Sequence, residues 1–248
     1  MHFKHYALGA LVAAGLVSAQ TAIAEPLAQT RESAKNMAAV PLAVDWSGFY
    51  LGATAGYVSG TSTYCSVSFV DSCDGNASNL PLPEPQPEGG VFGLTGGYAW
   101  QRGHLVYGFE ADISKANADG SAEDTAYFGC GSNDCQTDIL AMATLRGRVG
   151  YAHDKWLPYA TAGVGAMQLE VGLPNIDPAS RSKDIIVSPV IGLGVEYMAT
   201  ENISLKFEVL HIFTNDDLVA VGNGLCSSAC GATDIEASLV RFGVNYHF

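Results

Sequence analysis

The stretch Leu105-Val106-Tyr107-Gly108-Phe109-Glu110-Ala111-Asp112-Ile113-Ser114 alternates between two kinds of side chain. Its odd positions carry Leu, Tyr, Phe, Ala and Ile, whereas its even positions include Glu110 and Asp112. Successive side chains of a β-strand point to opposite faces, so the stretch predicts a strand with one apolar face and one acidic face. The fold depends on which face points outward, because a water-soluble sheet hides its apolar face and a sheet in a membrane can expose it.

Alternating segments of this kind recur from residue 46 onward. We expect eight strands, at residues 46–60, 89–101, 104–115, 137–151, 156–171, 184–199, 203–213 and 233–248. Gly accounts for 28 of the 248 residues, and Gly is unfavourable inside helices. The sequence therefore predicts an all-β fold.

The connections between these segments alternate in length. Those after the second, fourth and sixth strands span only a few residues, around 102–103, 152–155 and 200–202. The other four are long, at residues 61–88, 116–136, 172–183 and 214–232. This pattern predicts an eight-stranded antiparallel up-and-down transmembrane β-barrel with four long extracellular loops and short periplasmic turns.

The polar faces of the strands carry four acids and four bases. They are Glu110, Asp112, Glu196 and Glu208, and Arg146, Arg148, Lys206 and Arg241. An eight-stranded barrel is just wide enough for side chains to fill it, so these charges must pair with one another inside it. We expect Glu110 and Asp112 to lie near Arg146 and Arg148 and the lumen to be closed. The alternative is a soluble barrel with these charges on its outer face.

The apolar faces are then expected to contact lipid. In the fourth strand this face is predicted to include Ile139, Leu145 and Tyr151, whereas the fifth strand is ambiguous. Aromatic residues cluster at the short-turn rim and predict an interfacial girdle. Its expected members are Trp46, Trp100, Trp156, Tyr98, Tyr151, Tyr197, Tyr246 and Phe248.

The first residues have the pattern of a secretory signal. Lys4 precedes an apolar run, and Ala22-Ile23-Ala24 has the small residues of a cleavage site. We interpret residues 1–24 as a signal peptide, 25–45 as a flexible periplasmic leader and 46–248 as an outer-membrane barrel domain. A membrane anchor is the alternative for the first segment, although its apolar run is short for a bilayer-spanning helix.

Six cysteines in an exported chain indicate disulfides. They fall into three close pairs in long loops, Cys65/Cys73, Cys130/Cys135 and Cys226/Cys230. Fifteen pairings are possible for six cysteines, and the clustering favours the local one. A zinc site is disfavoured because the spacing is wider than Cys-x-x-C and no His lies nearby. We expect no metal or cofactor.

The net charge of −13 and the lack of a basic stripe exclude nucleic acid as an expected partner. Outer-membrane lipid, lipopolysaccharide and surface or host ligands at the outer loops are the expected partners.

Several motifs in order along residues 45–248 resemble the small Gram-negative outer-membrane β-barrels called "porin family" surface antigens, which share the OmpA-like transmembrane barrel fold. The motifs are Trp46-Ser47-Gly48-Phe49-Tyr50-Leu51-Gly52, residues 108–112 and 145–151, Leu157-Pro158-Tyr159, Gly194-Val195-Glu196-Tyr197 and the last strand, 240–248. The resemblance implies a location in the cell outer membrane and insertion by the barrel-assembly machinery through the strand ending at Phe248. It also implies structural, antigenic or adhesive roles.

Three other functions are alternatives to a structural and surface role. Haemin or small-ligand binding would need ligands in the outer loops, where Tyr64 and Tyr127 are candidates and no mature His lies. A narrow, low-conductance channel would need a gap in the charged lumen. Catalysis would need a base near the outer rim, where His211 is the sole candidate and its position in the strand turns it toward lipid. We therefore expect a non-enzymatic surface barrel.

Overall fold

The computed structural model describes residues 44–66, 84–122, 135–172, 181–213, 219–220 and 230–248. The predicted signal peptide and residues 25–43 of the predicted leader lie outside these ranges. Among the described residues, no helix has the length and hydropathy to cross a membrane.

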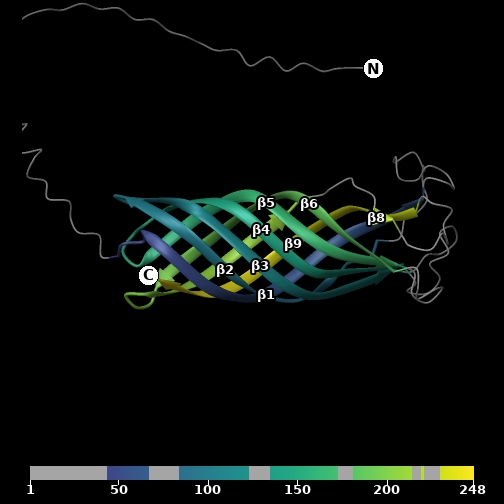
Figure 1. The fold of residues 1–248 in the computed structure, drawn as a ribbon, viewed down its shortest axis with the longest axis horizontal. Helices are drawn as coiled ribbons and strands as arrows, with labels where there is room; N and C mark the ends of the chain where they lie inside the picture. Colours follow the sequence, from purple (N-terminus) through teal and green to yellow (C-terminus); the bar gives the residue numbers. More distant parts are fainter. Residues whose placement is uncertain (1–43, 67–83, 123–134, 173–180, 214–218, 221–229) are drawn as a thin grey trace, which may run out of the picture. The chain divides into compact units, whose positions relative to one another are not determined.

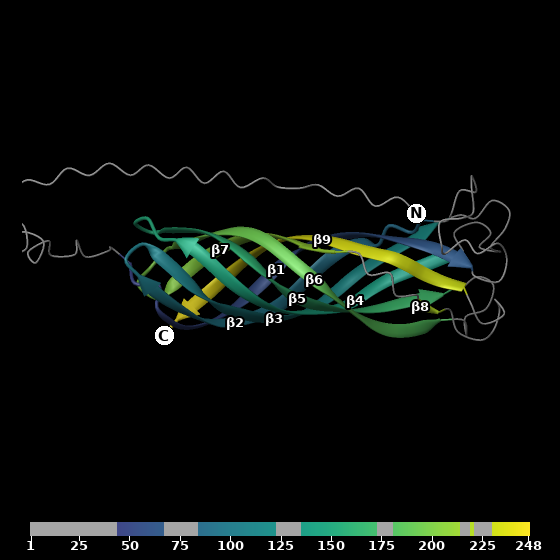
Figure 2. The same cartoon turned by 90° about the horizontal axis from the view of Figure 1, so that it is seen from above.

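The described chain folds into β-strands joined in sequence order. They are β1 (Gly48–Ser66), β2 (Glu88–Arg102), β3 (Leu105–Ala122), β4 (Cys135–Tyr151), β5 (Trp156–Gly172), β6 (Ser182–Met198), β7 (Ile203–Ile212), β8 (Val219–Ala220) and β9 (Cys230–His247). Each strand pairs antiparallel with its neighbour, and β9 pairs with β1 to close a barrel of eight strands, while the two-residue β8 adds to β9. Figures 1 and 2 show this closure, with the yellow β9 beside the purple β1. The predicted fold class is confirmed.

The three short turns lie at one end of the barrel. The β2–β3 turn contains Gly103, whose φ of 63° lies in the left-handed region that Gly adopts readily. The β4–β5 turn contains Asp154, whose φ of 51° is tolerated by Asp better than by most residues. The turn sequences thus account for the tight reversals at this end.

The strands are longer at the other end than the sequence predicted. β1 continues to Ser66 and β3 to Ala122, so residues 61–66 and 116–122 belong to strands rather than to loops. Pro87 and Pro85 accept backbone hydrogen bonds from Gly60 and Ser62, which places residues 84–87 alongside β1. The period-two signal was weak there because the residues on both faces are mainly small.

One assignment of faces was wrong. Ile139 was predicted to face lipid, but it is fully buried inside the barrel. The register between β4 and β5 shifts between Ile139 and Ala141, and such a bulge adds one residue and reverses the face of every side chain beyond it. Leu145 and Tyr151, on the other side of the bulge, are exposed as predicted.

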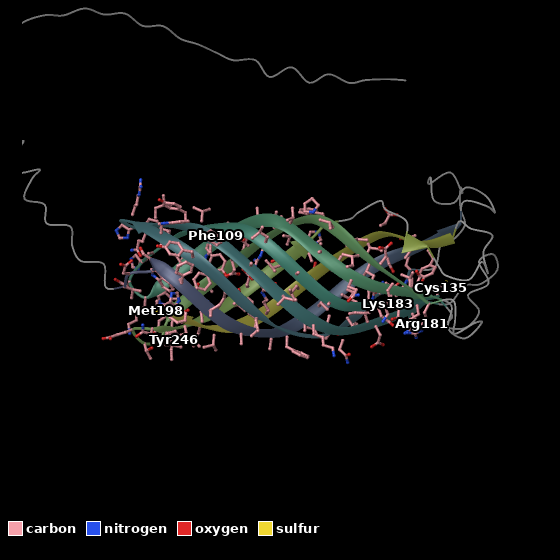
Figure 3. All side chains as sticks on the ribbon, in the orientation of Figure 1. Phe109, Cys135, Arg181, Lys183, Met198 and Tyr246 are labelled. Atoms are coloured by element: carbon pink, nitrogen blue, oxygen red, sulfur yellow. The ribbon has the colours of Figure 1, made fainter. Side chains whose placement is uncertain are left out.

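The interior of the barrel has three layers. At the short-turn end Trp46, Leu157 and Met198 form a small apolar cluster with other buried residues. A charged layer follows. Beyond it lies a larger apolar core that includes Ile139 and Leu169. Figure 3 shows the two ends, with Met198 toward one and Cys135 toward the other.

The outer surface of the short-turn half is apolar. Phe109, Leu145 and Phe242 are among its exposed side chains. The predicted aromatic girdle is confirmed in position for Trp100, Trp156, Tyr151, Tyr246 and Phe248, which are exposed. It is wrong for Trp46, which is 1 % exposed and edge-on to the ring of His247 inside the barrel, because it precedes β1 and folds across its opening.

Candidate functional site

The charged layer of the lumen collects side chains from five strands. β3 supplies two carboxylates, β4 two guanidinium groups, β6 one carboxylate, β7 a Lys and a Glu, and β9 one Arg. The members are Glu110, Asp112, Arg146, Arg148, Glu196, Lys206, Glu208 and Arg241, and all eight are buried, with at most 7 % of their surface exposed. Alternation within each strand turns these side chains inward while their apolar neighbours face outward.

Arg146 lies at the centre of this layer. Its Nη2 donates to Glu110 Oε1 at 2.7 Å and to Asp112 Oδ2 at 2.8 Å, and its Nη1 donates to Glu208 Oε1 at 2.9 Å. Glu110 is directly opposite Arg146 in the β3–β4 register, so a local pairing of strands creates the shortest of these contacts. One guanidinium therefore joins carboxylates from two strands that are not neighbours.

Two further bases complete the same cluster. Arg241 donates to Asp112 Oδ1 at 3.0 Å through Nη1, and its Nη2 lies 2.7 Å from Glu208 Oε2. Lys206 Nζ lies 2.8 Å from Glu110 Oε1. Each of the three carboxylates thus contacts at least two cations, which compensates for their removal from water.

Arg148 forms a second group nearer the short turns. Its Nη2 donates to Glu196 Oε2 at 2.8 Å, and its guanidinium lies over the ring of Tyr159, 4.2 Å from the centroid. Ser204 and Asn245 donate to the other carboxylate oxygen of Glu196 at 2.5 and 2.6 Å. The weaker 3.5 Å contact of Arg148 with Glu110 joins the two groups.

Sequence reasoning missed several uncharged members of this layer. Tyr50 donates to Glu110 at 2.8 Å, Tyr159 donates to Glu208 at 2.9 Å, and Thr144 donates to Asp112 at 2.5 Å. Tyr50 shares the parity of Gly52 and Thr54, and this signal could have been used to place it inward. Tyr159 lies in β5, whose small residues made its two faces hard to distinguish.

The eight charged side chains of the layer are shielded from solvent. Four acids and four bases bond to one another in a space lined by strands, and the aromatic rings of Tyr50 and Tyr159 fill the room between them. Within the described part of the chain, no group of three or more His, Cys, Asp or Glu could hold a metal ion. Arrangements of this kind hold side chains rigidly and leave few polar atoms for a ligand.

Of the two candidate haemin ligands, Tyr64 lies at the long-loop end of β1. Tyr64 is buried, and its hydroxyl donates to the carbonyl of Gln136 at 2.6 Å, so its ring packs inside the barrel. It was predicted to lie in a loop, and this was wrong because β1 extends to Ser66. Tyr127 lies outside the described residues.

Half of the cysteines predicted to form disulfides lie in strands rather than in loops. Cys65 is the last residue but one of β1, Cys135 begins β4 and Cys230 begins β9, because these strands extend further than the sequence predicted. The predicted partners Cys73, Cys130 and Cys226 lie outside the described residues.

The pairing of these cysteines is therefore untested. Cys135 is buried and disulfide-bonded, which agrees with an oxidised chain. Each predicted pair, Cys65/Cys73, Cys130/Cys135 and Cys226/Cys230, joins one cysteine in a described strand to one outside the described ranges. All three pairs stay predictions.

Comparisons with known proteins agree with this architecture. The chain is 28 % identical over 249 residues to the 31 kDa outer-membrane immunogenic protein of Brucella melitensis biotype 1, covering 97 % of each chain. It is 30 % identical over 171 residues to the 22 kDa outer membrane protein of Rhizobium leguminosarum, covering 69 % of this chain and 65 % of that one.

A solved structure shares the fold. The outer membrane protein OprG from Pseudomonas aeruginosa superposes with a TM-score of 0.51 at 12 % identity, covering 84 % of this chain and all of that chain. The family model for the outer membrane protein beta-barrel domain matches residues 9–248. The chain therefore belongs to the outer membrane protein β-barrel family, and it is a β-barrel of the cell outer membrane.

Proposed function

We propose that the protein is a non-enzymatic structural and surface-contact barrel whose lumen is closed by the charged layer. The observation that carries this proposal is the burial of all eight charges in mutual contacts inside the barrel. An aqueous pore would instead leave such side chains hydrated. Relatives named outer-membrane immunogenic proteins support a role at the cell surface.

Physical chemistry favours a permanent plug over a gate. Removing one partner from a buried ion pair leaves an unpaired charge in a medium of low dielectric, which costs several kcal/mol. Arg146, Arg241 and Lys206 are each held by carboxylates from more than one direction or by both oxygens of one carboxylate. Opening a path for water would break several of these contacts together.

The outer loops are the proposed site of contact with other molecules. We propose that disulfides tie the first, second and fourth loops to the strand ends beside them and limit their conformations, and that these loops contact lipopolysaccharide or surface ligands. The strand ending at Phe248 is the proposed signal for the barrel-assembly machinery. Cleavage after Ala24 and a flexible leader at 25–45 complete the proposed organisation.

The proposed function does not include catalysis. His211 lies on the outer surface of β7, with its Nδ1 3.1 Å from Ser238 Oγ. A Ser and a His in contact on an exposed face lack the shielded oxyanion site that acyl transfer requires. Incubation of the refolded protein with lipid A or a peptide substrate is expected to give no turnover. Turnover that disappears in His211→Ala would contradict this assignment.

Planar-bilayer recording tests the closed lumen. The refolded protein is expected to give no steady conductance, because water and ions would need to displace the charged layer. A large open barrel inserted in the same bilayer supplies the positive control. Steady steps at nanosiemens scale would overturn the proposal. Small, reproducible steps would favour the narrow channel instead, and they would be expected to change in Arg146→Ala.

A further inference from the structure

The outer surface of the barrel changes character partway along its length. On β9, Val240 is exposed and apolar, whereas Ser238 and Glu236 follow it toward the long-loop end. On β1 the exposed Tyr57 is followed by Ser59 and Thr61. The change falls at one height on both strands, because Tyr57 is the register partner of Val240 and Ser59 is the partner of Ser238.

The interior changes in the opposite sense at the same height. On β9, Arg241 is the inward-facing charged residue nearest the long-loop end. The next inward-facing side chains in that direction are Leu239 and Ala237, and both are buried. Leu239 is the register partner of Val58, which is also fully buried. Below this row the charged layer lies inside an apolar outer surface, and above it an apolar core lies inside a largely polar outer surface.

Other strands repeat the change on their outer surface. β3 passes from Ile113 to Lys115, Asn117 and Asp119, and β5 carries Glu170 on its outer face close to its end at Gly172. β6 differs, because Val187 and Ile185 remain apolar and are 59 % and 61 % exposed. The polar surface formed by Thr61, Asn117, Asp119, Asp138, Glu170 and Glu236 is here called the collar.

We propose that the acyl-chain layer of the membrane ends at the row of Tyr57 and Val240, and that the collar contacts the hydrated layer of phosphates and sugars above it. The nine residues Phe49–Tyr57 span about 23 Å along the barrel axis, given a rise of about 3.4 Å per residue and a tilt of about 40°. This matches the height of about 25 Å typical of the apolar band of outer-membrane barrels.

The part of the barrel above this row is then an extramembrane stalk. β1 continues from Ser59 to Ser66, which adds about 20 Å at the same rise and tilt. Water surrounds the stalk, so its stability comes from the apolar core inside it, as in a soluble protein. The hydroxyl of Thr61 and the amide of Asn117 can donate hydrogen bonds to phosphate and sugar oxygens, whereas the carboxylates of the collar accept hydrogen bonds from sugar hydroxyls and water. This inference goes beyond the closed lumen and does not depend on whether the barrel conducts.

Matched substitutions on one strand test the proposal. Ala55 and Thr61 both face outward on β1, on opposite sides of the proposed boundary. After refolding into phosphatidylcholine vesicles, Ala55→Arg is expected to lower the urea midpoint of unfolding clearly. Thr61→Arg is expected to leave it within error of the parent protein. An equal loss in both variants would place the acyl layer over the collar and overturn the proposal.

A milder pair covers the case in which Ala55→Arg does not fold. Ala55→Gln and Thr61→Gln introduce the same uncharged polar side chain at the two heights. The proposal expects a lower midpoint for Ala55→Gln alone. A lower midpoint for Thr61→Gln, or no difference between the two, would contradict it.

Discussion

The two halves of this barrel share the same strands but use opposite chemistry. In the half next to the short turns, Arg146 and its carboxylates lie in the interior, and apolar side chains such as Phe109 and Leu145 lie on the outside. In the other half, Ile139 and Leu169 belong to an apolar core in the interior, and the collar lies on the outside. Apart from the bulge beside Ile139, the strands alternate in the same way in both halves, so the difference lies mainly in which residues occupy each face.

This contrast shows how one continuous sheet can be stable in contact with lipid along one part and with water along another. A strand has no intrinsic inside or outside, and the surrounding medium selects the face that is exposed. Charges are stabilised inside the first half by contacts among themselves. Apolar side chains are stabilised inside the second half by burial. The two halves should therefore respond differently to the same kind of substitution.

The largest expected effect is the loss of a central charge. Arg146→Ala leaves Glu110, Asp112 and Glu208 with fewer cations in a buried site, and it should lower the free energy of unfolding by about 3–5 kcal/mol. Urea titration of the refolded protein in lipid vesicles measures it. A loss below that of the surface variant Arg181→Ala would contradict the central role of Arg146.

A smaller loss of stability is expected from a substitution in the apolar core of the half next to the long loops. Leu169 is fully buried, so Leu169→Ala should cost about 3 kcal/mol through lost burial and a cavity. Leu193→Ala, at a position that is 68 % exposed on the outer surface, is the matched control and should cost less. If the two variants unfold at the same urea concentration, the half next to the long loops lacks a tightly packed core.

A single hydroxyl should have a measurable effect in the charged layer. Tyr50→Phe removes a donor to Glu110 and an acceptor for Arg148, and it should cost about 1.5–2 kcal/mol because both partners are charged and buried. Tyr246→Phe alters a half-exposed ring on the outer surface and should be close to neutral. Equal stability of the two variants would show that the Tyr50 hydroxyl is dispensable.

The smallest expected effect concerns the ion pairs at the outer surface. Arg181 contacts Glu170 at 2.6 Å and Asp138 at 3.4 Å, but its side chain is 39 % exposed. Arg181→Ala should cost less than about 1 kcal/mol, since water screens exposed pairs. The cost should shrink further in high salt, whereas the cost of Arg146→Ala should change little. A salt-independent cost at Arg181 would argue against a hydrated collar.

The sequence pattern alone predicted the eight-stranded barrel. It also predicted that the eight charged residues lie on the inward faces of the strands, where they are buried. Alternation in the segments around Glu110, Arg146 and Glu208 was strong because large apolar residues separated the charges. Which charges meet across the lumen, such as Arg146 and Glu208, could not be predicted, because this depends on the curvature and stagger of the whole sheet.

The errors have local causes. The bulge beside Ile139 exchanges the inward and outward faces of β4. Nothing in the alternation of residues along the sequence indicates where this bulge lies. Trp46 was assigned to the girdle from its place in the chain, but the residue before a strand is not bound by the strand's alternation. The outer extensions of β1 and β3 were missed because Ser, Thr, Gly and Ala give little contrast between faces. The same extension moved Cys65 from a predicted loop into β1.

Contacts between lipid and backbone test the change of polarity most directly. In lipid nanodiscs, NMR cross-relaxation from acyl methylene protons should reach the backbone amide protons of Phe109, Leu145 and Phe242. It should not reach those of Thr61 and Asn117, which should instead be broadened by a water-soluble paramagnetic agent. Acyl contacts at Thr61 and Asn117, or strong broadening at Phe109, would contradict the account.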